Sequence, residues 1–224
     1  MLLKLSEWQR WSERCALFPN QGRLHELALR VVGQIRLGEA FNPRKLKYHL
    51  EAPVGSLLFV RSEDIPSLLY NGVGSIGLTG RDYVLEADVD LHVLDSLNVC
   101  CGHLALQVRS DSSISSVAEL PNAARVVSQY PRFSVRAIHG ANRHDVDVIP
   151  ISGAAETYVS AGMADGSIDV IASGETAAAN SIKVAAHIAY TSAVLVCRGR
   201  KPSWGQFETE IVRAAVTAAR QLEA

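Results

Sequence analysis

Residues 164–180, ADGSIDVIASGETAAAN, bring carboxylates, hydroxyls and a glycine turn into one short stretch. Asp165 and Asp169 lie before and within an apolar strand pattern. The residues after this strand, where a helix could begin, are small or polar: Ser173, Gly174, Glu175, Thr176 and Ala177. Backbone N–H groups at a helix start attract phosphates, and carboxylates accept hydrogen bonds from a diol such as ribose. A turn aspartate and a strand-edge charge are the alternative interpretations of Asp165 and Asp169.

Two further turns have the same order of strand, small-residue turn and helix start. The first is FPNQGRL, which contains Gln21, Gly22 and Arg23. The second is LTGRDY, where Arg81 follows Gly80 and could give a forked contact to an anion. The alternative for the second turn is a helix cap followed by a surface arginine. Three such turns in one chain favour a ligand with several phosphates.

Other patterns favour ordinary structural roles. The glycines of GVGSIG, residues 72–77, follow a helical pattern and lead into a strand, which is the wrong order for a dinucleotide fingerprint. His103 and His144 have no second histidine or acid at ligand spacing, so we expect strand or surface residues there. Because no ligand spacing of this kind is present, we expect no metal held directly by protein ligands. No serine has the surroundings of a catalytic nucleophile.

Composition limits the class of protein. The chain has 224 residues, 48% of them apolar, with 22 basic and 23 acidic side chains. It can form one large domain or two small ones, and it has no general basic field for nucleic acid. Its first residues do not have the pattern of a signal peptide, and four cysteines without CxxC spacing suggest reduced thiols. We predict a cytoplasmic protein with small, buried cysteines.

Short β-branched runs alternate with segments of helical period, which predicts an α/β protein with largely parallel strands. The predicted strands are 14–18, 57–60, 75–78, 91–97, 103–108, 125–128, 145–149, 168–171 and 193–197. The predicted helices are 24–35, 63–70, 82–86, 115–120, 133–139, 155–161, 176–180 and 204–222.

The stretch CGHLALQVRSDSSISSV changes from a strand pattern to a polar, serine-rich turn. We interpret it as a crossover between two lobes, with a second crossover near 181–185. The predicted organisation is a first lobe of residues 1–105 plus 182–224 and a second lobe of residues 106–181. The second lobe would carry the phosphate turn of ADGSIDVIASGET, with a cleft between the lobes.

Taken in order, several segments resemble ATP phosphoribosyltransferase in its short form, which has no C-terminal regulatory domain. They are FPNQGRL, RSEDIPSLLYNGVGSIGLTGRDYVLE, RVVSQYPRF and ISGAAETYVSAGMADGSIDVIASGET. The resemblance covers roughly residues 14 to 198. It implies a two-lobed α/β fold similar to type II periplasmic binding proteins. It also implies transfer of phosphoribosyl from phosphoribosyl pyrophosphate to N1 of ATP, with release of pyrophosphate, as the first step of histidine biosynthesis.

The resemblance also implies roles for individual residues. Asp165, Asp169 and Glu156 would lie at the ribose, and residues 173–177 would wrap the 5′-phosphate. The residues implied for ATP or pyrophosphate are Gln21, Gly22, Arg23, Gly80, Arg81 and Tyr130. Family members often carry lysine where Gln21 stands and arginine where Glu175 stands, so fewer cations meet the phosphates here. We therefore expect weak binding of phosphoribosyl pyrophosphate in the absence of a partner.

The resemblance further implies Mg²⁺ that arrives with the substrate, and a homodimer inside a hetero-oligomer with a subunit related to histidyl-tRNA synthetase. We expect no membrane or nucleic-acid partner. Two other functions stay open at this point. One is a related phosphoribosyltransferase with another acceptor, and the other is a non-catalytic ligand-binding or regulatory homologue.

Overall fold

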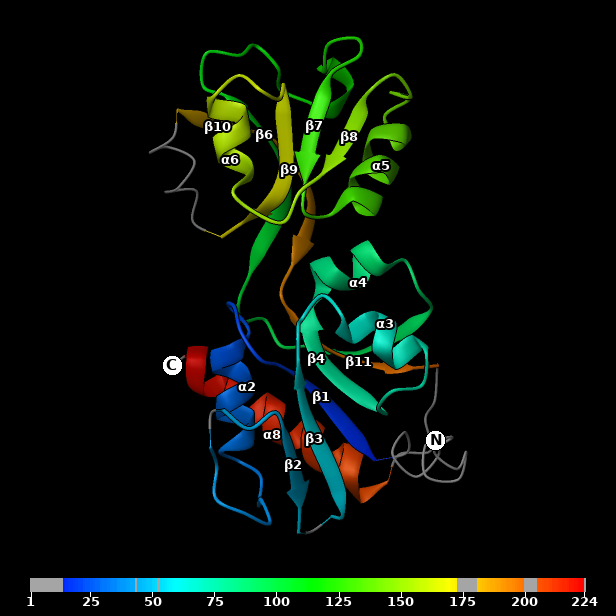
Figure 1. Cartoon of the computed structure of the whole chain (residues 1–224), viewed down its shortest axis with the longest axis vertical. Coiled ribbons are helices and arrows are strands. Elements are labelled where there is room, and N and C mark those ends of the chain that lie inside the picture. Colours follow the sequence, from blue (N-terminus) through cyan, green and yellow to red (C-terminus); the bar gives the residue numbers. More distant parts are fainter. Residues whose placement is uncertain (1–13, 43, 52, 173–180, 200–204, 224) are drawn as a thin grey trace. The chain divides into compact units, whose positions relative to one another are not determined.

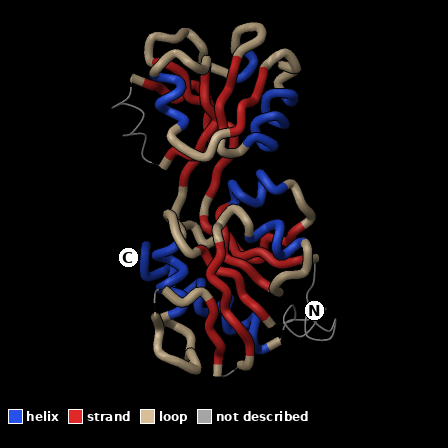
Figure 2. The backbone as a smooth tube through the Cα atoms, viewed as in Figure 1, coloured by secondary structure: helices blue, strands red, loops and turns tan. Residues whose placement is uncertain are grey.

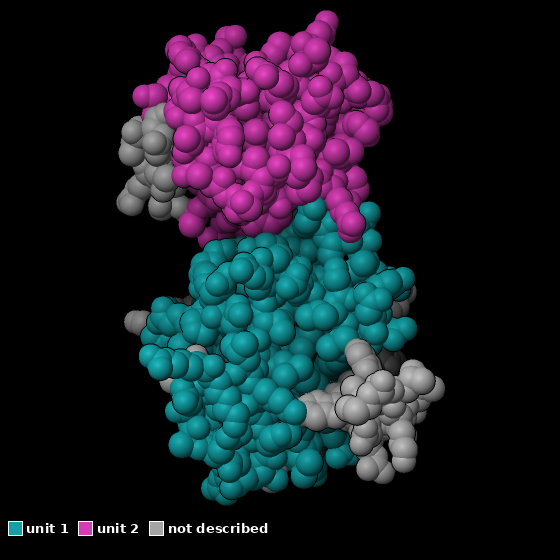
Figure 3. Space-filling model, in the orientation of Figure 1, with its two compact units in different colours: residues 1–100, 192–224 teal, residues 101–191 magenta. Residues whose placement is uncertain are grey.

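The computed structural model describes residues 14–42, 44–51, 53–172, 181–199 and 205–223. The chain divides into unit 1, residues 1–100 with 192–224, and unit 2, residues 101–191 (Figure 3). Each unit has its own β-sheet with helices packed against it (Figure 1). Among the described residues, no helix is both long and apolar enough to cross a lipid bilayer.

The sheet of unit 1 has six strands in the order β2-β3-β1-β4-β11-β5. Their bounds are β1 Cys15–Pro19, β2 Lys47–Leu50, β3 Gly55–Val60, β4 Ile76–Gly80, β5 Leu91–Ser96 and β11 Ala193–Arg198. Strand β1 pairs in parallel with β3 and β4, whereas β2 and β11 pair antiparallel with their neighbours. The carboxyl ends of β1, β3 and β4 therefore meet at one edge.

Helices cover both faces of this sheet. Helices α2 (His25–Val32) and α8 (Gln206–Glu223) share one hydrophobic cluster, in which Leu27 and Ile211 are fully buried. A second cluster holds Ile65 and Leu69 of α3 (Ile65–Tyr70), and α4 (Arg81–Ala87) follows β4. Burial of each such aliphatic side chain contributes about 1.5–3 kcal/mol. Successive side chains of β1 point to opposite faces of the sheet, so Leu17 packs in the second cluster and Phe18 in the first.

The sheet of unit 2 has five strands in the order β10-β6-β9-β7-β8. Their bounds are β6 Gly102–Arg109, β7 Arg125–Ser128, β8 Asp147–Pro150, β9 Gly166–Ile171 and β10 Ile182–Thr191. Strands β8, β7 and β9 are parallel, whereas β6 and β10 run antiparallel to their neighbours. The sheet is flanked by α5 (Pro131–Gly140) and α6 (Ala155–Ser160), and a short 3-10 helix spans Val117–Glu119 (Figures 1 and 2).

Several sequence predictions need correction. The sheets are mixed rather than largely parallel, because five of the nine strand pairings are antiparallel. Strands β2 and β10 were not predicted, and β10 occupies the place expected for the second crossover. The unit boundaries fall after residues 100 and 191 rather than 105 and 181, since β6 and β10 pair with each other along their length. The helix predicted at 176–180 lies outside the described residues.

The glycines at 72–77 have the structural role that the sequence suggested. Helix α3 ends at Tyr70, and β4 begins at Ile76. Gly72 and Gly74 between them have φ angles of 81° and 89°, in the region that favours glycine. In the strand itself, a Cβ on Gly77 would lie 2.6 Å from Ile65. These glycines therefore end a helix and let it pack closely on the strand.

Candidate functional site

The first candidate region is the edge of unit 1 where β1, β3 and β4 end. In open α/β sheets, ligands bind outside the carboxyl ends of parallel strands. The loop after β1 carries Gln21, Gly22 and Arg23, and α4 starts at Arg81 directly after β4. The backbone N–H of Asn20 donates to the carbonyl of Val60 at 2.8 Å, which ties the ends of β1 and β3 together. The fold thus brings two of the three predicted turns to one edge.

Arg23 connects these two turns. Its Nη2 lies 2.6 Å from Oδ1 of Asp82, whose side chain is fully buried in the first turn of α4. Its Nη1 donates to the carbonyl oxygen of Cys100 at 2.5 Å. We expected Arg23 to face a phosphate as a cation, but a buried carboxylate in the same unit already balances its charge. Arg23 is therefore first an anchor of its loop, and Asp82, which sequence reasoning missed, is its partner.

Gly80 makes this arrangement possible. A Cβ at position 80 would lie 2.2 Å from Oδ1 of Asp82 and 3.1 Å from Nη2 of Arg23. Any side chain there would displace the ion pair. In the other turn, Gly22 has a φ of 78°, which favours glycine, and Gln21 beside it is exposed. Both glycines therefore have a local structural reason for their identity.

Exposed cations also lie at this edge. Arg81 is exposed at the start of α4, and its backbone N–H donates to the carbonyl of Ser192 at 3.0 Å. Arg61 follows the end of β3, and more than half of its side chain is exposed. Its Nη1 lies 3.5 Å from Oε1 of Glu63. Sequence reasoning missed Arg61, although its place directly after a predicted strand was a usable signal. Exposed arginines at such an edge can bind phosphates by forked hydrogen bonds.

The second candidate region is the edge of unit 2 where β7, β8 and β9 end. Tyr130 follows β7, Glu156 follows β8, and Ala172 follows β9. Glu156 is half-buried in the first turn of α6, after Ala154, whose φ of 54° is left-handed. A left-handed non-glycine residue costs on the order of 1–3 kcal/mol, and such residues gather at functional sites. The predicted phosphate segment, Ser173, Gly174, Glu175, Thr176 and Ala177, lies outside the described residues.

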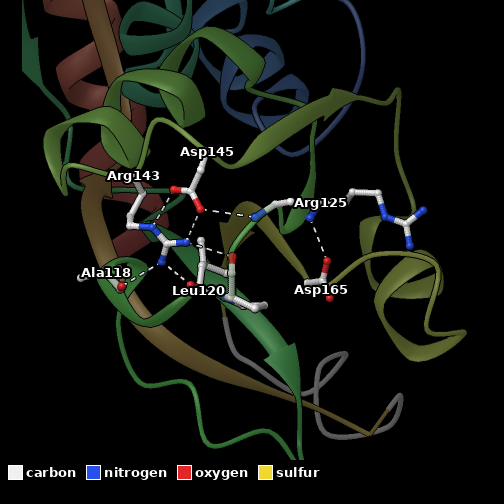
Figure 4. Close-up of polar contacts among 8 residues, drawn as sticks. Ala118, Leu120, Arg125, Arg143, Asp145 and Asp165 are labelled. Atoms are coloured by element: carbon white, nitrogen blue, oxygen red, sulfur yellow. Dashed lines mark hydrogen bonds and ion pairs between the residues drawn. The ribbon is translucent and has the colours of Figure 1, made fainter.

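Asp169 and Asp165 occupy opposite ends of β9. Asp169 is half-buried within the strand, and its Oδ1 accepts from the backbone N–H of Val170 at 2.7 Å. Asp165 precedes the strand, and its Oδ2 accepts from the backbone N–H of Arg125 at 2.8 Å (Figure 4). Six strand residues separate Asp165 from Ala172, about 20 Å at the usual rise. Asp165 therefore joins the starts of β9 and β7, and of the two aspartates predicted at the ribose only Asp169 lies toward the end of β9.

Tyr130 lies just beyond the end of β7. Only 3% of it is exposed. Its backbone N–H donates to Oγ of Ser128 at 2.9 Å, and its carbonyl accepts from Ser134 in α5. Ser128 in turn donates to the carbonyl of Ile168, which links the end of β7 to the middle of β9. Tyr130 thus helps to hold this edge together, and its role at ATP or pyrophosphate stays a prediction.

The cysteines divide into two kinds. Cys15 and Cys197 are buried in unit 1, and burial raises the pKa of each thiol to about 11. The prediction of small core residues is confirmed for these two. Cys101 is exposed, however, and accepts a hydrogen bond from the hydroxyl of Tyr190 at 2.9 Å. Within the described ranges, no group of three or more histidine, cysteine, aspartate or glutamate side chains is placed to hold a metal ion.

Each of the two units has a mixed sheet flanked by helices, and this α/β fold is similar to that of type II periplasmic binding proteins. Truncated ArgBP from Thermotoga maritima, arginine-bound, matches with a TM-score of 0.55 at 11% identity, over 97% of this chain and 99% of that chain. The ATP phosphoribosyl transferase (HisG:HisZ) complex from Thermotoga maritima matches more strongly, with a TM-score of 0.74 at 19% identity, over 93% of this chain and 97% of that chain.

Sequence comparison gives the family. The family model for HisG, ATP phosphoribosyltransferase, matches residues 61–217, and the chain belongs to this family. An ATP phosphoribosyltransferase of Methanopyrus kandleri is 33% identical over 179 residues, which cover 80% of this chain and 62% of the relative. One of Methanococcoides burtonii is 28% identical over 207 residues, 92% of this chain and 72% of the relative. The chain therefore spans about three fifths to three quarters of these relatives.

Proposed function

We propose that the chain transfers a phosphoribosyl group from phosphoribosyl pyrophosphate to N1 of ATP and releases pyrophosphate, the first step of histidine biosynthesis. The observation that carries this proposal is membership of the ATP phosphoribosyltransferase family over residues 61–217. The residues at the edge of each unit support it, because unit 2 offers carboxylates suited to ribose and unit 1 offers arginines suited to phosphates. A cytoplasmic location stays a prediction from the sequence.

In the proposed donor site, Asp169 and Glu156 accept hydrogen bonds from the ribose hydroxyls. Both are half-buried: Asp169 lies on β9, and Glu156 lies in the first turn of α6, which follows β8. The 5′-phosphate belongs to residues 173–177, directly after Ala172. Departure of pyrophosphate from C1 builds positive charge on the ribose ring, which nearby carboxylates stabilise. Catalysis in this proposal is mainly positioning and electrostatics.

In the proposed phosphate site of unit 1, Arg81 and Arg61 provide the cations. Gln21 and Gly22 provide backbone N–H groups, and the Arg23–Asp82 pair fixes the loop that presents them. Forked arginine contacts stabilise the negative charge of the triphosphate or of the departing pyrophosphate. Arg23 has a structural role here in addition to any contact with a phosphate.

Magnesium in this proposal arrives with phosphoribosyl pyrophosphate. Phosphoribosyl pyrophosphate carries the phosphate oxygens that Mg²⁺ prefers as ligands. We further propose a homodimer within a hetero-oligomer. Its second subunit would be related to HisZ. The fold of this chain matches a chain of the ATP phosphoribosyl transferase (HisG:HisZ) complex from Thermotoga maritima.

The test is a reaction of the chain with ATP, Mg²⁺ and phosphoribosyl pyrophosphate, with and without a HisZ-type subunit. Adenine absorbance and pyrophosphate release are followed together. We expect product in both mixtures, with weaker donor binding when the subunit is absent. Thr176→Ala should weaken donor binding about tenfold, near 1.4 kcal/mol. Absence of product in both mixtures would contradict the proposal, and pyrophosphate release only with another acceptor would favour a related phosphoribosyltransferase.

A further inference from the structure

The edge of unit 2 carries three ring side chains that the proposed function does not use. His103 lies at the start of β6, and His187 and Tyr190 lie on β10. The ring centroids of His103 and His187 are 4.6 Å apart, and those of His103 and Tyr190 are 5.5 Å apart. We call these three residues the ring cluster.

A β-bulge places the ring cluster on one face of the sheet. His187 and Tyr190 are three positions apart, so in a regular strand they would point to opposite faces. The register of β10 shifts between His187 and Ala189, so that His187 pairs with Ala105 and Tyr190 pairs with His103. Both side chains therefore share the face of His103. Bulges of this kind occur next to active sites, where they change the direction of a side chain.

The ring cluster lies beside the proposed ribose carboxylate. Ala105 pairs with His187 on one side and with Asp169 on the other, so all these residues share one face. His103 pairs with Ile171, the last residue of β9. A Cβ on Gly102 would lie only 2.7 Å from the carbonyl oxygen of Ile171, so the two strands approach closely here. The cluster thus lies at the ligand end of β9.

The chemistry of the ring cluster suits a phosphate oxyanion. An imidazole donates an N–H hydrogen bond in either protonation state, and a phenol donates its O–H. The hydroxyl of Tyr190 now donates to Sγ of Cys101 at 2.9 Å, and a phosphate oxygen is a stronger acceptor than sulfur. His187 is exposed and 45% of Tyr190 is exposed, so both can meet a ligand.

We propose that His103, His187 and Tyr190 bind a phosphate group of the phosphoribosyl donor next to Asp169. The identity of the ligand rests on the proposed function. The phosphate is either the 5′-phosphate or the pyrophosphate, since both have the same acceptor chemistry.

The test is calorimetric binding of phosphoribosyl pyrophosphate, ribose 5-phosphate and inorganic pyrophosphate to the full chain. His187→Phe and Tyr190→Phe keep a ring at each position and remove its donor. We expect each variant to weaken binding of phosphoribosyl pyrophosphate by roughly five- to tenfold. A matching loss for ribose 5-phosphate assigns the 5′-phosphate, and one for inorganic pyrophosphate assigns the leaving group.

The control variant is His139→Phe. His139, in the last turn of α5, and His144, in the loop before β8, form a second ring contact with centroids 4.5 Å apart. We expect His139→Phe to bind all three ligands like the wild type. Unchanged binding in His187→Phe and Tyr190→Phe, or no binding of any of the three ligands by the wild type, would overturn the inference. Weakened binding in these variants without product from the wild type would instead reject only the proposed function.

Discussion

Nη2 of Arg23 and Oδ1 of Asp82 lie 2.6 Å apart, although 59 positions separate the two residues in the sequence. Asp82 is fully buried, and about a third of the Arg23 side chain is exposed. The pair joins the loop after β1 to the first turn of α4. It therefore couples the stability of unit 1 to the shape of the edge where we propose that phosphates bind.

The first prediction concerns this pair. Asp82→Asn keeps the shape of the side chain but leaves the guanidinium without its buried counter-charge. We expect a loss of about 1–3 kcal/mol in the free energy of unfolding, measured by urea denaturation. Glu26→Gln is the control, because the Arg30–Glu26 pair on α2 is exposed and should contribute at most about 0.5 kcal/mol. Equal losses in the free energy of unfolding for Asp82→Asn and Glu26→Gln would contradict the claim that burial makes the Arg23–Asp82 pair the stronger one.

The second prediction concerns Gly80. In Gly80→Ala, the new Cβ would lie 2.2 Å from Oδ1 of Asp82, so the carboxylate must move away from Arg23. We expect lower stability together with weaker binding of ATP, measured by calorimetry. Gly140→Ala is the matched control, since its Cβ would meet no atom within 4 Å. Equally strong ATP binding in both variants would contradict the prediction that the Arg23–Asp82 pair supports ATP binding.

The third prediction separates the two aspartates of β9. Asp169→Ala should weaken binding of phosphoribosyl pyrophosphate about tenfold, as expected for a lost hydrogen bond to a charged acceptor. Asp165→Ala should leave binding unchanged but lower stability by about 0.5–1.5 kcal/mol, because it removes the acceptor for the backbone N–H of Arg125. Calorimetry and urea denaturation measure the two effects. Weakened binding in Asp165→Ala would return that residue to the ribose site.

The fourth prediction concerns pH and the Arg143–Asp145 pair. Arg143 forms two hydrogen bonds with Asp145 and also donates to the carbonyls of Ala118, Leu120 and Pro121 (Figure 4). The hydrogen bonds from Arg143 hold the pKa of the Asp145 carboxyl well below its ordinary value of 3.8. A depressed pKa in the folded state contributes stability above the unfolded pKa, and the contribution disappears as pH falls toward the folded pKa.

Asp145→Asn should therefore unfold at lower urea concentration than the wild type near neutral pH. The difference in the free energy of unfolding should shrink steadily as the pH falls below about 4. The measurement is a series of urea titrations across this pH range. Asp111→Asn gives a comparison, because Arg109 likewise lowers the pKa of Asp111, in an exposed pair within one short turn. A difference for Asp145→Asn that is constant with pH would contradict this account.

The sequence by itself determined most elements and two of the turns that we place at the unit 1 edge. Apolar β-branched runs predicted β1, β4, β7 and β9, because short runs of this kind favour buried strands. Glycine turns followed by helical patterns located Gly22 and Gly80 at the ends of strands. The order of these segments along the chain was also sufficient to suggest the family, which the family model then confirmed.

Tertiary structure decided which of these residues meet. Asp165 and Asp169 are four positions apart, yet strand direction puts the first at the start of β9 and the second near its end. Arg23 became an anchor because the fold buries Asp82 beside it. The ring cluster exists because a bulge in β10, a strand that the sequence did not reveal, turns His187 and Tyr190 to one face. Such pairings depend on strand register and direction, which local sequence patterns do not specify.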